Sequence, residues 1–149
     1  MRIREVRDAH EIAEIYRKLG LVASTLFYKE EISLEKFLWC FGEGGSFLYE
    51  CYNDQGVAVG IVFFFAVTEW AVKIGTAGYG GHAKASNMRE VLGIVEGELR
   101  RRGAKVLIAE VPSAKTALRK ILPKMGFSMS GCIPHYFGDE GMLYFVKGL

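Results

Sequence analysis

The sequence has few of the residues that mark a metal centre, a disulfide framework or a membrane span. Its three cysteines (Cys40, Cys51 and Cys132) are scattered and form no Cys-x-x-Cys pair, so we expect reduced, partly buried thiols. The three histidines are equally scattered, and no metal cofactor is expected. The densest apolar run, Val57–Val67, is far shorter than the ~20 residues of a membrane-spanning helix. The first residues lack the apolar stretch of a signal peptide, so the expectation is a cytoplasmic protein with no membrane partner.

Neither sign of charge is in large excess over the whole chain, but basic side chains gather in its middle. Residues 84–124 carry ten basic and four acidic side chains, whereas residues 1–83 carry eight and eleven. A basic segment can bind a polyanionic ligand, either a nucleotide-like cofactor or a nucleic acid. Equally, these basic residues can be the solvent-exposed faces of two helices. No aromatic-interleaved recognition module accompanies the basic residues, so a nucleic-acid partner is not expected.

The first half of the chain alternates between helical and extended patterns. Half of the residues are hydrophobic, and the length predicts a single domain over residues 1–149. Asp8 and Ser33 are the expected N-caps of two helices, and Gly20 is expected to end the first of them. The predicted order is a strand at 3–6, helices at 9–19 and 34–41, and strands at 46–52, 57–67 and 70–76.

The pattern of the second half predicts a helix, a strand and a second helix, followed by two final strands. Asn87, with Glu90 three residues later, is the expected cap of a helix that runs to about residue 102. Residues 106–111 form a continuous apolar run, which predicts a buried strand. The next helical stripe spans 114–125, and Pro123 should end or kink it near Leu122 because proline lacks an N–H. Strands at 127–133 and 142–147 complete a mixed α/β pattern.

Three stretches of the second half resemble the GNAT superfamily of acetyl-CoA-dependent N-acyltransferases. They are the helix–strand stretch Glu98–Val111, the helix ending in Lys124-Met-Gly-Phe127, and the tail Ile133–Lys147. With the order of elements, the resemblance covers nearly the whole chain. It implies a GNAT-like fold: a central mixed, largely antiparallel sheet of six to seven strands with helices on both faces. It also implies acetyl-CoA as co-substrate.

The resemblance places the acyl-CoA against the strand before the long helix and at the start of that helix. The residues it implies there are Thr76, Ala77, Gly78, Lys84, Ala85, Ser86, Asn87 and Met88. The family's phosphate-binding loop supplies glycines, which let backbone N–H groups approach phosphate oxygens. Here the Arg and both glycines are missing, because the motif positions fall on Ala83, Ser86 and Met88. Two interpretations stay open: free N–H groups still bind pyrophosphate, or Ser86 and Asn87 serve only as helix caps.

The catalytic residues implied by the resemblance are also partly replaced. The family commonly places a tyrosine acid four residues before the Gly of Gly-Phe, and that position is Leu122. The Asn expected seven residues earlier is Lys115. Tyr136 is the first candidate to replace the acid and Tyr79 the second. Glu69 and His82 are the candidate bases, since an ammonium must lose its proton before it attacks a thioester.

The leading hypothesis is therefore direct transfer of an acetyl or other acyl group from acyl-CoA to the primary amine of a small molecule or protein. The alternative is a protein of the same fold that has lost acetyl-CoA binding and serves as a structural or interaction module, or uses another donor. The missing glycines and the missing tyrosine are what this alternative predicts. A homodimer is compatible with either hypothesis.

Overall fold

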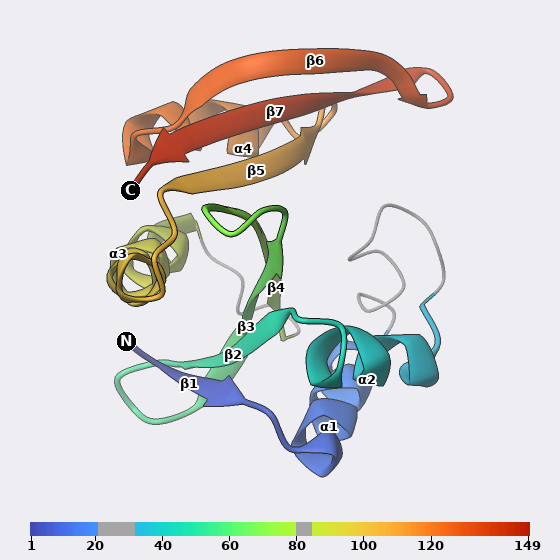
Figure 1. Cartoon of the computed structure of the whole chain (residues 1–149), viewed down its shortest axis with the longest axis vertical. Helices are drawn as coiled ribbons and strands as arrows, with labels where there is room; N and C mark the ends of the chain where they lie inside the picture. Colours follow the sequence, from blue (N-terminus) through green and yellow to red (C-terminus); the bar gives the residue numbers. More distant parts are fainter. Residues whose placement is uncertain (21–31, 80–84) are drawn as a thin grey trace. The chain divides into compact units, whose positions relative to one another are not determined.

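The computed structural model describes residues 1–20, 32–79 and 85–149, with the backbone alone for residues 85–88 (Figure 1). Its helices and strands follow in the order β1 (Arg2–Val6), α1 (Ala9–Leu19), α2 (Leu34–Gly42), β2 (Phe47–Tyr52), β3 (Ala58–Ala66), β4 (Ala71–Gly78), α3 (Ala85–Arg101), β5 (Val106–Pro112), α4 (Thr116–Ile121), the 3₁₀ helix η3 (Pro123–Met125), β6 (Ser128–Phe137) and β7 (Glu140–Gly148). This is the order that the sequence predicted.

The strands form one seven-stranded sheet in the order β1-β2-β3-β4-β5-β7-β6. Strands β4 and β5 pair in parallel, from Ala71 opposite Val106 to Ile74 opposite Ala109. The pairs β1–β2, β2–β3, β5–β7 and β6–β7 are antiparallel. A parallel pair requires a crossover connection, and α3 provides it between β4 and β5. The predicted mixed and largely antiparallel sheet is confirmed.

The chain divides into two compact units that interleave along the sequence. Unit 1 consists of Met1–Phe65 and Gly75–Ile94, and unit 2 of Ala66–Ile74 and Val95–Leu149. Strand β4 and helix α3 therefore each contribute to both units. The single domain expected over residues 1–149 stays a prediction.

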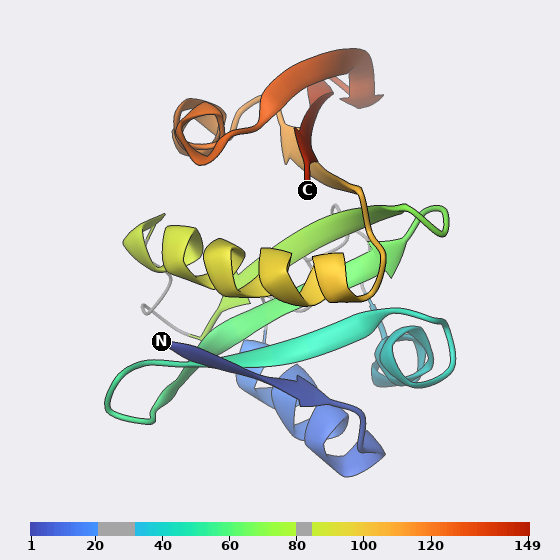
Figure 2. The ribbon, with the colours of Figure 1, turned by 60° about the vertical axis from the view of Figure 1, so that its left-hand side comes forward.

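In unit 1, two capped helices cover one face of the sheet. The Asp8 side chain accepts a hydrogen bond from the Glu11 N–H at 3.1 Å, and Ser33 accepts one from the Lys36 N–H at 3.1 Å. Both predicted N-caps are thus confirmed. Helices α1 and α2 pack with the strands into a core whose members include Ile12, Ile15, Phe37, Phe41, Leu48, Ile61 and Phe63. Figure 2 shows the start of α3 on the opposite face of the unit 1 strands.

The predicted cap of α3 is wrong. The helix begins at Ala85, so Asn87 lies inside its first turn and not before it. Alanine and serine are both accepted in the first turn of a helix, and a polar residue followed by a glutamate does not by itself fix where the turn begins. The first free backbone N–H groups therefore lie earlier in the sequence than Asn87 predicts.

In unit 2, the sheet has one buried face and one half-exposed face. On β5, Leu107, Ala109 and Val111 are buried, whereas the alternate residues are only partly buried. The prediction of a wholly buried β5 is therefore wrong, because a pleated strand presents successive side chains to opposite faces. Glu110 belongs to the half-exposed set. As predicted, α4 ends at Ile121 and Pro123 opens η3 in place of another helical turn.

Candidate functional site

The predicted phosphate-binding segment can be described only in part. His82 and Lys84 lie outside the described residues, as do the side chains of Ala85, Ser86, Asn87 and Met88. The backbone of the last four forms the first turn of α3, which continues for 17 residues. The first N–H groups of a helix have no partner within it, and a long helix carries a partial positive charge at this end.

The predicted pantetheine-binding residues occupy the last part of β4, in unit 1. Thr76 is exposed, and Ala77 and Gly78 are partly buried. Strand β3 approaches this segment closely, because a Cβ added to Gly60 would lie 2.3 Å from the carbonyl oxygen of Ala77. Directly after β4, the Tyr79 N–H donates a hydrogen bond to the Val59 carbonyl at 2.9 Å. The end of β4 is thus fixed against β3.

Tyr79 is unsuited to the role of acid that the sequence allowed for it. Its side chain is buried, with 8% of the residue exposed. Its hydroxyl already donates a hydrogen bond of 2.9 Å to Oε1 of Glu50. Burial, and then the hydrogen bond to the Glu50 carboxylate, raise the pKa of Tyr79 well above its ordinary range. The hydroxyl proton is therefore held and not available to a substrate.

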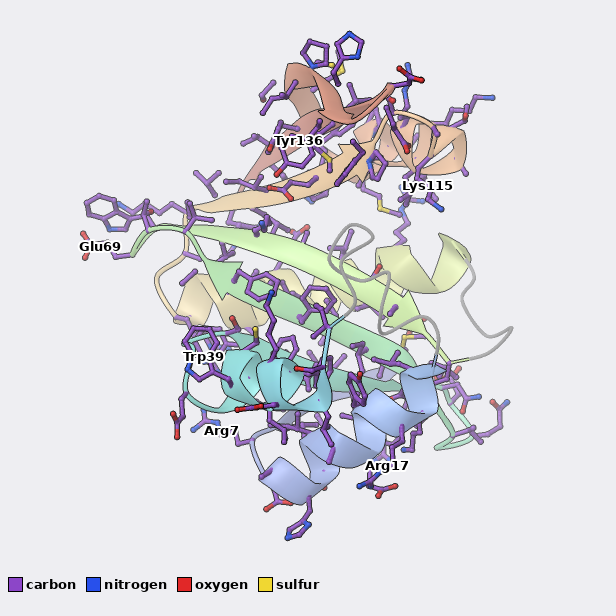
Figure 3. The ribbon with its side chains drawn as sticks, turned by 90° about the vertical axis from the view of Figure 1, so that its right-hand side faces the viewer. Arg7, Arg17, Trp39, Glu69, Lys115 and Tyr136 are labelled. Carbon is purple, nitrogen blue, oxygen red and sulfur yellow. The ribbon has the colours of Figure 1, made fainter. Side chains whose placement is uncertain are left out.

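Glu69, one of the two predicted bases, lies in the turn between β3 and β4. Figure 3 shows it at the outer tip of that turn, well away from Tyr136. The side chain is exposed, as are its neighbours from Ala66 to Trp70. Exposure at the tip of the turn does not favour Glu69 as the base. His82, the other predicted base, is not described.

Tyr136, the predicted acid, lies near the end of β6 in unit 2 and is 45% exposed (Figure 3). Its ring packs edge-on against Phe137, with 4.8 Å between the ring centroids. The preceding His135 has a positive φ of 56°, and the β6–β7 register is irregular between Ile133 and Phe137. Such an irregularity turns a side chain away from its regular position on the strand.

Tyr144 on β7 joins Tyr136 to a glutamate that the sequence did not single out. Burial, then the charge of Glu110, and then Tyr136, by its charge and its hydrogen bond, raise the pKa of Tyr144. Glu110 on β5 lies directly opposite Tyr144 on β7. Its Oε1 accepts a hydrogen bond of 3.2 Å from Nζ of Lys73, on β4. Three strands of unit 2 thus bring Glu110, Tyr144 and Tyr136 together on the half-exposed face.

The sequence held a signal for Glu110 that the apolar pattern concealed. It is the one charged residue in the run Val106–Val111, which was interpreted as wholly apolar. A carboxylate in a strand that is otherwise hydrophobic requires a polar partner or a function. Lys73 supplies the partner, and 10% of the Glu110 side chain remains exposed.

The family's usual acid position is filled by a core residue. Leu122 is 4% exposed and follows α4 directly, while Lys115 precedes α4 and is exposed. Leu122 carries no proton to donate, so it has only a packing role. Tyr136 is the exposed tyrosine of the cluster and stays the predicted acid.

Three arginines of the basic segment 84–124 form ion pairs with glutamates of α3. Arg100 pairs with Glu96, and Arg101 and Arg102 both pair with Glu98. These pairs one turn apart are typical of a solvated helix face. They favour the helix-face interpretation over a nucleic-acid surface at this end of α3.

The described part of the chain contains neither a metal-binding group nor a membrane-spanning helix. Among residues 1–20, 32–79 and 89–149, no group of three or more acidic, histidine or cysteine side chains is placed to hold a metal ion. Within the described residues, no helix has the length and apolar character needed to cross a membrane.

No family model and no curated protein sequence matches this chain, but solved structures do. A mutant form of the spermidine N-acetyltransferase of Vibrio cholerae matches at a TM-score of 0.80 and 10% identity, over 99% of this chain and 95% of that one. The protein yncA of Salmonella typhimurium, solved with its cofactor acetyl-CoA, gives 0.76 and 20%, over 100% and 94%. The ribosomal-protein-alanine N-acetyltransferase of Brucella melitensis gives 0.73 and 20%, over 100% of both chains.

Proposed function

We propose that this chain, which has the fold of the GNAT superfamily, transfers an acyl group from acyl-CoA to a primary amine. The observation that carries the proposal is the cluster of Glu110, Tyr144 and Tyr136 on the half-exposed sheet face of unit 2. It supplies a carboxylate and an exposed phenol, the base and the acid that such a transfer needs. The similar structures named for spermidine and ribosomal-protein acetylation support an amine acceptor.

The roles follow from the chemistry of the two groups. Glu110 attracts the ammonium form of the acceptor and takes one proton from it. The free amine then attacks the thioester carbonyl, forms the new C–N bond and expels the CoA thiolate. Tyr136 gives its proton to the thiolate, and a second amine proton is lost to solvent or to the phenolate. A carboxylate that is partly buried suits a cationic acceptor better than a neutral one.

The residues predicted to hold acyl-CoA fit it in part. Thr76, Ala77 and Gly78 are small, so an extended arm can approach the backbone of β4 closely. The first turn of α3 offers free N–H groups, and Lys84 precedes it in the sequence. The two glycines missing from the phosphate-binding motif are the departure from the family that affects the affinity for acyl-CoA. Cytoplasmic location and the choice of acyl group stay predictions.

The test is isothermal titration of the purified protein with acetyl-CoA, repeated with Ser86→Glu. We expect micromolar binding by the wild type and a loss of at least tenfold in Ser86→Glu, since a carboxylate in the first turn repels phosphate. Ser128→Glu, at an exposed position of β6 in unit 2, is the matched control and should bind normally. Equal binding by all three proteins would place the phosphate elsewhere.

The second candidate is a GNAT-fold protein that has lost acetyl-CoA binding, a role favoured by one observation. The position of the usual tyrosine acid is the buried Leu122. Such a protein would serve as a structural or interaction module or would use another donor. No heat and no thermal shift with millimolar acetyl-CoA would establish this alternative and overturn the acyltransferase proposal.

A further inference from the structure

A buried carboxylate, Glu50 on β2, lies in unit 1 and has no part in the proposed reaction. The residue is 3% exposed. Its Oε1 accepts hydrogen bonds from the Tyr79 hydroxyl at 2.9 Å and from Nζ of Lys18 at 3.1 Å. Its Oε2 accepts from the Tyr52 hydroxyl and, at 3.4 Å, from Nη2 of Arg4. Donors from β1, α1, β2 and the end of β4 thus converge on one carboxylate.

Burying such a polar cluster in a core is energetically unfavourable compared with apolar packing. Removing a carboxylate and its partners from water carries a large desolvation penalty, and apolar side chains of similar volume often give equal or greater stability. Hydrogen bonds differ from apolar contacts because they are directional. A saturated polar cluster therefore fixes the relative position of the elements that it joins more narrowly than apolar packing does.

The element that gains most from this constraint is the end of β4. Tyr79 is the first residue after the strand, and it is held at two points, by its backbone N–H to Val59 and by its hydroxyl to Glu50. Beside it, Gly60 lets β3 approach the carbonyl of Ala77 more closely than any Cβ would allow. The short stretch Thr76–Gly78 is therefore followed directly by Tyr79, which two hydrogen bonds hold in place.

We propose that Glu50 and Tyr79 are positioning residues for acyl-CoA: their hydrogen bond holds the last residues of β4, Thr76–Gly78, in the conformation that receives the extended arm of the thioester. The inference rests on the proposed function, and it adds two residues that do not touch the reacting atoms. The side chain of Tyr79 reaches Glu50 within the core of unit 1, so its effect on the ligand passes through the backbone of β4.

The experiment compares Tyr79→Phe with Tyr52→Phe. Each variant keeps its ring and removes one hydroxyl donor from the same carboxylate, but only Tyr79 adjoins β4. Amide hydrogen exchange of a peptide covering Thr76–Tyr79 is measured without ligand, and the Kd for acetyl-CoA is measured by titration. We expect Tyr79→Phe to raise both the exchange rate and the Kd about tenfold, and Tyr52→Phe to change either by less than about twofold.

The two readouts separate this proposal from the proposed function. Equal acceleration of exchange in both variants would show that the cluster only stabilises unit 1, and would overturn the positioning role. Unchanged exchange and Kd in a folded Tyr79→Phe would overturn it as well. If the wild type does not bind acetyl-CoA, the proposed function fails, and the exchange rates still decide whether the hydroxyl of Tyr79 holds the end of β4.

Discussion

Glu50 in unit 1 and Glu110 in unit 2 are similar residues in different circumstances. Each lies on a strand, and each has a lysine and a tyrosine nearby. Glu50 is almost wholly buried, and four side chains donate hydrogen bonds to it. Glu110 is only slightly more exposed, at 10% of its side chain, and Lys73 donates the hydrogen bond found for it among the described residues.

The two glutamates differ in how many carboxylate lone pairs are still free to accept a hydrogen bond. A carboxylate that already accepts four hydrogen bonds inside a core has no lone pair left for a substrate, so its role is to hold its donors. A carboxylate with one donor keeps lone pairs that can accept a proton or bind a cation. Hydrogen-bond saturation, and not the type of residue, separates a structural glutamate from a candidate base.

The largest expected effect is the loss of stability in Glu50→Ala. Removing this carboxylate leaves the buried Tyr79 hydroxyl and the Lys18 ammonium without their acceptor, and we expect the free energy of unfolding to fall by about 3 kcal/mol. Denaturant unfolding followed by circular dichroism measures it. Glu110→Ala is the matched comparison and should lose about 1 kcal/mol, since it leaves a single donor, the Lys73 ammonium, without its acceptor, and this 31% exposed side chain can turn to solvent. Similar losses in the two variants would remove the distinction drawn between the two glutamates.

The next effect is on activity, and here the substitution of Glu110 is expected to have the larger effect. Glu110→Gln keeps the shape of the side chain and removes its basicity, so we expect kcat to fall about 100-fold with little change in stability. Steady-state acetyl transfer to a polyamine or peptide amine measures it. Asp139→Asn, an exposed change between β6 and β7, should leave kcat unaltered. A large loss in Glu69→Gln with an active Glu110→Gln would return the role of base to Glu69.

The smallest effect concerns stability in acid. Burial by itself would raise the pKa of Glu50, but hydrogen bonds from Tyr52, Lys18 and Tyr79 and the charge of Lys18 outweigh it, so the pKa is lowered. The stabilisation from this group is thus complete above the ordinary glutamate pKa, about 4.3, and is lost as the pH falls through the lower value in the folded protein.

Denaturant unfolding between pH 6 and pH 3 tests this on the wild type and on Glu50→Gln. Glu50→Gln should be less stable at pH 6 and should lose less stability than the wild type as the pH falls. Parallel curves for the two proteins would show that Glu50 titrates alike in the folded and unfolded chains.

Local signals in the sequence were sufficient for most of the elements. Asp8 and Ser33 cap the first two helices because their short side chains reach a free N–H, and this geometry depends only on neighbouring residues. Pro123 ends α4 for an equally local reason. The same reasoning failed at Asn87, because several polar residues near Ala85 can satisfy the first turn and the sequence does not rank them.

The sequence by itself determined the order of strands and helices, because periodicity and local chemistry act over a few residues. The resemblance to the GNAT fold rests instead on particular stretches, among them Glu98–Val111 and Ile133–Lys147, and it is the resemblance that implied the largely antiparallel sheet. The partners of Glu50 and Glu110 were decided only by the tertiary structure. Tyr79 lies 29 residues from Glu50, and Lys73 lies 37 from Glu110. A local sequence pattern cannot reveal contacts between residues so far apart in the chain. The burial of each glutamate and the number of its hydrogen-bond donors are set only once the strands have paired.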